Sequence, residues 1–329
     1  QRVLRLGLFA IAVIVLMLGA AYLFREPLLR VVGINLDRGA AGETALDVPA
    51  GYSADVFASG LDHPRFMAVA PDGTLFVAEP GENRVVALPD ADADGQADEV
   101  IEVGSGLDVA HSLAFADDGS LLVAGSGTLF RLTLDEARTE VGREEILDYA
   151  PSGQHSTRTI AIEPDGDLLI SHGSSCNVCW EEDEERASII TAPSEGGEWR
   201  VLMRGLRNAV GVAIDPATGQ AWATNNGRDM MGDDMPGDEL NHAPRKGMHF
   251  GFPYCHQGDT LDPEFGEGKN CADYVPPSLT LGAHVAALGM TFYDGGMFPE
   301  HYRGDLFIAQ HGSWNRSSKV GYNVLRVRF

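Results

Sequence analysis

From Val48 onward, short apolar runs alternate with turns rich in Asp, Gly, Pro and Asn. This alternation is typical of β-strands joined by tight turns, and helical periodicity is nearly absent. One unit recurs: an apolar strand, a tight turn and a second apolar strand. Its copies are MAVAPDGTLFVAE from Met67, LAFADDGSLLVAG from Leu113, IAIEPDGDLLISH from Ile160, VAIDPATGQAWATN from Val212 and MTFYDGGMFP…GDLFIAQ from Met290. The pattern predicts an all-β domain built from repeats.

The spacing of the copies indicates which repeat architecture they form. They begin roughly 46, 47, 52 and 78 residues apart, and periods of about 40–50 residues with several short strands are those of propeller blades. A propeller closes its ring to remove exposed strand edges, yet the sequence ends at YNVLRVRF without a polar turn. We therefore expect a six-bladed β-propeller whose last blade is truncated in this chain. Residues 244–285 break the spacing and are predicted to form an elaborated loop on one face.

The N-terminal residues differ in character from this domain. Residues 6–24, LGLFAIAVIVLMLGAAYLF, carry no charge, and at about 1.5 Å per residue such a helix just spans a bilayer core. A cleaved signal peptide usually has a shorter apolar region of roughly 7–15 residues. We expect a transmembrane signal anchor over residues 1–30, with a cleaved signal as the alternative. A linker over 31–48 and the propeller domain over 49–329 would follow.

The cysteines and the net charge limit the cellular compartment in which the protein can lie and the partners that it can bind. The sequence CNVCW lacks the His of the C-x-x-C-H haem motif. Four cysteines in an exported domain most simply form two disulfides, 176–179 and 255–271, with a structural metal as the alternative. Disulfides indicate an oxidising compartment, so we expect an inner-membrane anchor with the propeller in the periplasm. The net charge of −24 argues against nucleic acid as a partner.

Polar residues recur just before the strand that should line the central channel of each blade. There the blades converge at one rim, and convergent polar groups at a channel mouth are the default hypothesis for a binding site. Each residue could instead cap its own loop or face water. The candidates are His63, His111, His155, Arg158, Arg207, Asn208 and His284.

Two acidic segments are candidate calcium sites. NNGRDMMGDDMPGDELN, over residues 225–241, combines Asp229, Asp233, Asp234, Asp238 and Glu239 with glycines beside the presumed rim. Carboxylates and carbonyls are the hard oxygen ligands that Ca²⁺ prefers. DADADGQADE, over residues 90–99, resembles the first half of an EF-hand loop, but Ile101 occupies the position of its bidentate Glu. For this second segment we expect a structural ion or a plain turn.

Several motifs together resemble the glucose/sorbosone dehydrogenase family. They are GLRNAVGVAIDPATG, NNGRD…GDD.P.DELN, FGFPYC, LGMTFYDGGMFP and GDLFIAQHGSWNR. The resemblance covers roughly residue 49 to the end, and GSSCNVC and HGSWNR are more similar to the sorbosone or pyranose dehydrogenase branch. It implies a six-bladed propeller that uses Ca²⁺ and pyrroloquinoline quinone (PQQ) to oxidise a sugar or sugar aldehyde.

The resemblance also implies roles for individual residues. His155 matches the general base that takes the proton of the sugar C1 hydroxyl while hydride passes to the quinone. This role suits an imidazole, whose unperturbed pKa is about 6.5. Arg207 and Asn208 match the pair that binds and polarises the quinone. Gly227 and Arg228 match positions whose carbonyls coordinate the cofactor Ca²⁺, and for Asp238 and Glu239 we expect a second, structural Ca²⁺. Further candidate contacts to the cofactor are His111, Arg316 and Lys319.

The chain also departs from the family pattern. A Gly-Asp pair orients the base in the soluble glucose enzymes, whereas Gly173-Ser174 stands here; Ser174 could accept from the imidazole, and His172 or Asp165 could substitute. The family's arginines that clamp the PQQ carboxylates belong to a later blade, so the cofactor site is expected to be incomplete. Arg158 matches no family role and is expected in a structural ion pair. Electrons would pass to a separate cytochrome or quinone. The alternatives are a Ca²⁺-dependent lactonase-type propeller hydrolase and a non-catalytic binding propeller.

Overall fold

The computed structural model describes residues 46–150 and 153–329, and the part it describes is built almost entirely from β-strands. The first sheet runs in the order β1-β2-β3-β4 and the second in the order β5-β6-β7-β8, with every neighbour antiparallel. Their strands are β1 (Met67–Val69), β2 (Leu75–Glu79), β3 (Arg84–Leu88), β4 (Ile101–Ser105), β5 (Ser112–Phe115), β6 (Leu121–Ala124), β7 (Thr128–Leu134) and β8 (Glu140–Asp148).

The third, fourth and fifth sheets repeat this meander with one strand more, the same number and one strand fewer, respectively. The third sheet, β9 to β12, gains β16 as a parallel edge strand, the fourth has the order β13-β14-β15-β19, and the fifth has the order β20-β21-β22. Their strands are β9 (Ile160–Ile162), β10 (Leu168–His172), β11 (Ser188–Ala192), β12 (Arg200–Arg204), β16 (Met248–His249), β13 (Val212–Ile214), β14 (Ala221–Asn225), β15 (Gly237–Ala243), β19 (Leu279–Ala283), β20 (Ala287–Phe292), β21 (Leu306–Gln310) and β22 (Asn323–Val327).

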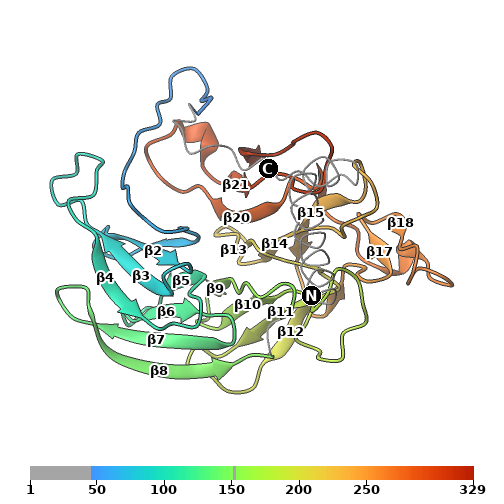
Figure 1. The fold of residues 1–329 in the computed structure, drawn as a ribbon, viewed down its shortest axis with the longest axis horizontal. Coiled ribbons are helices and arrows are strands. Elements are labelled where there is room, and N and C mark those ends of the chain that lie inside the picture. The colour runs from blue at the N-terminus through green and yellow to red at the C-terminus, as the bar shows by residue number, and fades with distance from the viewer. Residues whose placement is uncertain (1–45, 151–152) are drawn as a thin grey trace, which may run out of the picture.

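The five sheets follow one another around a common centre, as Figure 1 shows. The first strand of each sheet contacts the first strand of the next, from β1 through β5, β9 and β13 to β20. Separate apolar clusters fill the spaces between neighbouring sheets; one, for example, joins Phe76 of β2 to Leu121 and Val123 of β6. Each sheet therefore buries its apolar faces against its neighbours, as the blades of a propeller do.

This architecture confirms the all-β, propeller-like prediction, and each of the five recurring units forms the first two strands of a blade. Between β1 and β20 lies a cavity of about 620 Å³ lined by apolar residues that include Phe66, Met290 and Phe307. The described residues form five blades, so the sixth blade stays a prediction. The expected anchor over residues 1–30 lies outside the described residues, and within the described part no helix is long and apolar enough to cross a membrane.

The prediction of one elaborated loop over residues 244–285 is wrong at its C-terminal end. This segment contains β16, the short hairpin of β17 (Cys255–His256) and β18 (Thr260–Leu261), and the 3-10 helix η1 (Cys271–Asp273). It then supplies β19, which pairs with β15 as the outermost strand of the fourth blade. The insertion thus separates the third and fourth strands of one blade, which explains why the spacing of the repeats increases here.

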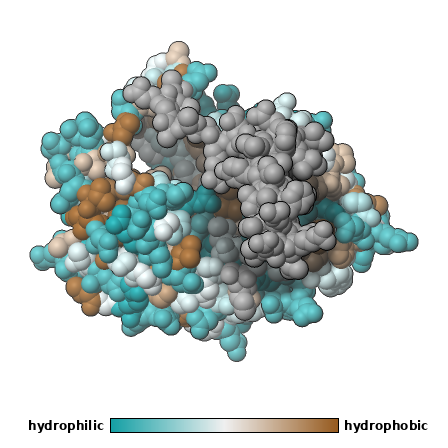
Figure 2. Space-filling model, viewed as in Figure 1, coloured by the Kyte–Doolittle hydropathy of each residue, from teal (hydrophilic) through white to brown (hydrophobic). Residues whose placement is uncertain are grey.

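Both predicted disulfides are present, Cys176–Cys179 and Cys255–Cys271, with Cα–Cα distances of 6.1 and 5.6 Å. The second fastens η1 to β17 within the insertion. A second 3-10 helix, η2 (Glu300–Tyr302), precedes β21. Hydrophilic residues cover most of the described part of the face shown in Figure 2, as expected for a chain of this net charge.

Candidate active site

A polar pocket of about 240 Å³ lies where the loops of several blades meet. It collects residues that are far apart in the chain, and seven of them were candidates from the sequence: His155, Arg207, Asn208, Gly227, Asp229, Asp238 and His284. The other lining residues are Gln154, Asn226, Ala286, Trp314 and Asn315. Of the seven predicted rim residues, four therefore meet in one pocket, whereas His63, His111 and Arg158 do not line it.

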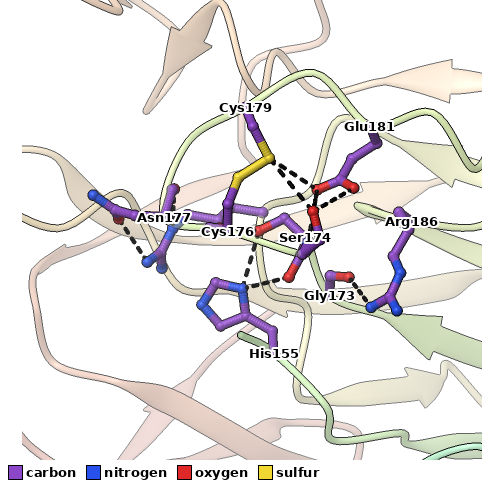
Figure 3. Close-up of a disulfide and its surroundings, with 10 residues drawn as sticks. His155, Gly173, Ser174, Cys176, Asn177, Cys179, Glu181 and Arg186 are labelled. Atoms are coloured by element: carbon purple, nitrogen blue, oxygen red, sulfur yellow. Dashed lines mark hydrogen bonds between the residues drawn. A yellow bond between two sulfur atoms is a disulfide. The ribbon is translucent and has the colours of Figure 1, made fainter. Parts of the chain in front are cut away.

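His155 is half-buried and held by the segment that follows β10. Figure 3 shows that its Nδ1 faces both the carbonyl oxygen and the hydroxyl of Ser174. The two distances are 2.9 and 3.0 Å. That hydroxyl donates its own proton to the Cys176 carbonyl at 2.6 Å. Both groups near Nδ1 are therefore acceptors, so Nδ1 carries the ring proton. Nε2 is left with a free lone pair toward the pocket, which is the form a general base requires.

Gly173 makes this approach possible. A Cβ at Gly173 would lie 2.4 Å from the Cβ of His155 and 2.9 Å from Oδ1 of Asn208. Both distances are shorter than van der Waals contact, so a side chain at this position would push the base and the amide apart. The Gly173-Ser174 pair thus orients His155 mainly through a backbone carbonyl, and no aspartate is needed for it.

Burial and the charge of Arg207 lower the pKa of His155 to about 4. A lowered pKa favours the neutral ring, so the base form is present above about pH 5 and is lost as the pH falls through the folded pKa.

The pH profile of kcat/KM should therefore lack an acid limb near the ordinary histidine pKa of about 6.5 and fall only below about pH 5. Steady-state rates from pH 4 to 8 measure this. Ser174→Ala keeps the backbone carbonyl that accepts from Nδ1, so the acid limb of its kcat/KM profile should fall at the same pH as in the wild type. An acid limb near pH 6.5 in the wild type would contradict the environment described for His155.

Arg207 is buried, with 3 % of its surface exposed. Hydrogen bonds to three other residues fix the orientation of its guanidinium. It pairs with Asp229 at 2.6 Å and donates to the Gly227 carbonyl at 2.7 Å. Asn177 accepts twice, through its backbone carbonyl and its Oδ1, each at 2.8 Å. Because the guanidinium is already held in place, little side-chain entropy is lost when a ligand in the pocket binds to its positive charge.

Asn177 sits inside the loop closed by the Cys176–Cys179 disulfide (Figure 3). Besides binding Arg207, its side chain accepts from the Asp229 amide at 2.9 Å and donates to the Asp229 carbonyl at 3.2 Å. The same loop supplies the Cys176 carbonyl that fixes the Ser174 hydroxyl. One disulfide-closed turn therefore positions both the base and the guanidinium.

Asp238 is a good candidate to hold a cation. It is 2 % exposed and accepts from the amides of Gly227 at 2.8 Å and Ala286 at 2.7 Å. No cationic side chain of the described residues lies within ion-pair distance of it, and burial raises its pKa to about 7. A divalent cation would supply the missing positive charge. The Gly227 carbonyl and the Asn226 amide are further oxygen donors at the same pocket.

The remaining metal candidates lie elsewhere. The Arg228 side chain forms ion pairs with Asp262 and Glu264 of the insertion. Glu239 is buried and accepts from Asn225, Asn241 and the Gln257 amide, so it does not share a ligand set with Asp238. The two neighbours in β15 point to different partners because successive strand residues face opposite sides.

The three further cofactor candidates do not line the pocket. His111 donates to the Arg158 carbonyl at 2.9 Å and lines the larger cavity between β1 and β20. Arg316 donates to the Asp233 carbonyl and pairs with Asp234. The Lys319 ammonium lies 5.9 Å from the centre of the Tyr322 ring. Their assignment to the cofactor stays a prediction.

Arg158 does not make the ion pair expected for it within the described part of the chain. Its guanidinium donates to the His155 and Thr157 carbonyls at 3.2 and 3.1 Å. His172 and Asp165 do not contact His155 either: His172 is fully buried beside Tyr149, and Asp165 lies in the turn between β9 and β10. His63 is exposed and bonds to Asp62.

Asn177 and Asn315 are site residues that sequence reasoning missed. Asn315 donates to Asp229 at 2.7 Å and lies 3.4 Å from Nδ1 of His284. Both belong to segments singled out for their resemblance to the family, CNVC and HGSWNR. An asparagine between two cysteines carries no signal of its own, since its role follows from where the closed turn lies.

The fold and the pocket define a β-propeller with a polar site at the meeting point of its blades. The chain belongs to the TrAA12-like family, whose pattern matches residues 46–329. An uncharacterised protein of Borreliella burgdorferi is 37% identical over 53% of this chain and 46% of its own length. A pyrroloquinoline quinone-dependent sugar dehydrogenase of Hypocrea jecorina is 22% identical over 52% of this chain and 49% of its own. The chain thus spans about half the length of these curated relatives.

Among solved structures, the holo pyranose dehydrogenase PQQ domain of Coprinopsis cinerea superposes with a TM-score of 0.72. The match is 23% identical and covers 83% of this chain and 76% of that domain. At this identity the likeness concerns the fold.

Proposed function

We propose that this protein is a quinoprotein dehydrogenase that oxidises a sugar or sugar aldehyde, with PQQ and Ca²⁺ bound at the pocket of His155 and Arg207. The observation that carries the proposal is the pairing, in one pocket, of a histidine whose Nε2 is free with a rigidly held guanidinium. The names of the Hypocrea and Coprinopsis relatives point to the same chemistry.

The residues of this chain would divide the work as follows. PQQ, when bound, supplies the two-electron acceptor for the hydride. His155 takes the proton of the substrate hydroxyl at Nε2, while Nδ1–H stays on the Ser174 carbonyl. Arg207 stabilises negative charge that develops on oxygens in front of it. Asn208 adds an amide whose backbone is fixed by Asn225 at 3.0 Å.

Steady-state assays test this proposal. The protein, supplied with PQQ and Ca²⁺, should reduce an artificial electron-accepting dye with members of a panel of aldoses, and PQQ or the sugar left out should abolish the rate. The pocket's carboxylates and asparagines also suit a lactone-hydrolysing propeller with a single metal. Lactone hydrolysis without PQQ, together with no dye reduction, would favour that hydrolase instead.

Calcium at Asp238 gives a separate prediction. Ca²⁺ should raise the melting temperature of the cofactor-free protein, because a ligand that binds only the folded state stabilises it by mass action. Asp238→Asn should remove most of this shift, whereas Asp234→Asn, at a side chain that is 89% exposed, should not.

Calcium bound at the loop of residues 90–98 would also raise the melting temperature, and this contribution must be separated from that of Asp238. Asp90, Asp92 and Asp94 lie close enough together to share an ion, so Asp92→Asn measures their contribution in the same melting assay. An equal Ca²⁺ response in wild type and Asp238→Asn would contradict the assignment of Asp238.

We also propose that a sixth blade fills the space between β1 and β20 in the complete propeller. Met67 and Val69 of β1 and Val324 of β22 are 61%, 64% and 67% exposed, beside the apolar cavity. Exposed apolar surface of this kind marks a missing contact.

In the complete natural protein, mild peroxide should therefore oxidise Met67 much more slowly than Met297, which is 91% exposed. Equal oxidation of the two, measured by peptide mass analysis, would contradict a covering blade.

The remaining assignments are part of the same proposal. We place the propeller in the periplasm on an N-terminal membrane anchor, which the two disulfides of the described structure support. Electrons would leave for an acceptor outside the propeller domain, within which no C-x-x-C-H haem motif occurs.

A further inference from the structure

A second group of polar side chains is buried behind His155, outside the pocket. Tyr149 follows β8, Arg158 precedes β9, His172 ends β10, and Arg186 precedes β11. Their exposed fractions are 8%, 0%, 0% and 5%. Burying such groups is costly unless they find hydrogen-bond partners.

Several donors of this group have no partner within the described part of the chain. They are Nε and Nη2 of Arg158 and the hydroxyl of Tyr149, and neither ring nitrogen of His172 is bonded. The groups lie together: the His172 ring centre is 5.0 Å from that of Tyr149, and the Arg158 guanidinium carbon is 5.7 Å from the same ring. Three buried side chains with five unsatisfied polar atoms so close together indicate a bound species that accepts hydrogen bonds.

The charges of the group show what kind of species this is. Arg158 and Arg186 bring two positive charges, and no described carboxylate lies within ion-pair distance of either. The adjacent carboxyl group is that of Glu185, which is buried and accepts from the Ala150 amide; burial raises its pKa. Burial and Arg186 lower the pKa of Arg158 only to about 10, so it stays charged near neutrality. The cluster thus has surplus positive charge.

We propose that Arg158, Tyr149 and His172 form a buried binding site for a small monovalent anion of the halide class. Arg158 would contribute Nε and Nη2, Tyr149 its hydroxyl, and neutral His172 one N–H. A halide accepts all of these bonds and offsets one positive charge, whereas water satisfies donors but adds no charge.

This site would support the geometry of His155 from behind. Arg158 uses its third donor, Nη1, on the His155 carbonyl at 3.2 Å, and Arg186 donates to the Gly173 carbonyl at 3.4 Å. An anion that fixes Arg158 therefore also fixes the backbone of His155, while Arg186 holds the neighbouring Gly173 carbonyl. The proposal holds whether or not the pocket carries out the proposed reaction.

Bromide is the direct probe. Crystals of the cofactor-free protein grown or soaked in bromide should show an anomalous peak in contact with Nη2 of Arg158 and the Tyr149 hydroxyl. In solution, chloride should raise the melting temperature relative to gluconate at equal ionic strength, saturating at millimolar concentration. An adventitious ion only, with no saturable response in solution, would overturn the proposal. A normal water in place of the anomalous peak would overturn it as well.

Variants separate this site from general salt effects. Tyr149→Phe removes one donor without changing the ring, and should weaken the apparent chloride affinity about tenfold, the usual cost of a lost hydrogen bond to a charged group. Arg138→Met removes a half-buried surface arginine paired with Asp72, far along the chain from this site, and should keep the full response. Equal chloride responses in wild type and Tyr149→Phe would contradict the assigned ligands.

Discussion

Replacing His155 by Asn should lower kcat by about 10²–10⁴-fold, the usual contribution of a positioned general base. Asparagine retains a donor near Nδ1 that can still reach the Ser174 carbonyl, but it has nothing to accept a proton where Nε2 stood. Binding of PQQ should change little, because the charge that the cofactor meets is that of Arg207. Dye-coupled rates and cofactor titration on the same preparation measure the two quantities.

The matched control for this variant is His301→Asn, at an exposed histidine of η2 that lies outside the pocket. It should retain the rate of the wild type. If His155→Asn keeps its turnover, the pocket does not act through this base, and the chain is either a binding propeller or a different enzyme.

Replacing Arg207 by Lys should lower kcat/KM by about 10²–10³-fold, as removal of a preorganised donor does. Lysine keeps the charge, but its three donors cannot reproduce the four bonds that the planar guanidinium makes to Asn177, Gly227 and Asp229, so the charge loses its fixed direction. The variant should also bind PQQ more weakly. Titration of PQQ against wild type and variant, together with steady-state rates, checks both effects.

Asn177→Ala provides a graded comparison for Arg207. It leaves the guanidinium and the backbone carbonyl in place and removes only the Oδ1 acceptor and the bonds to Asp229. Its loss of kcat/KM should lie between wild type and Arg207→Lys, with the acid limb of the pH profile unmoved. If Arg207→Lys has wild-type kcat/KM, the fixed guanidinium has no part in turnover.

Much of the fold could be read from the sequence because the blade unit is local. Each copy needs only two apolar strands and a turn of the Asp-Gly type, and all five formed as expected. The position of β19 could not be predicted from the sequence. An insertion separates β19 from its partner β15 in the chain, and no local pattern determines the length of that insertion.

The site was predictable where it depended on residue type at the rim, as for His155, Arg207 and Asn208. It was not predictable where a backbone atom or a turn does the work. The Ser174 carbonyl orients the base, and Asn177 acts because a disulfide holds its turn against Arg207. The ion pair expected for Arg158 failed for a related reason: its partners are carbonyls, which sequence does not distinguish.

The most direct measurement for the proposed function is an anaerobic absorbance titration of the protein with PQQ in the presence of Ca²⁺, followed by addition of a sugar. We predict saturable, equimolar binding at micromolar PQQ. The sugar should then reduce the bound cofactor in wild type, but far more slowly in His155→Asn. Absence of saturable PQQ binding at micromolar cofactor, or equally fast reduction in both proteins, would contradict the central claim.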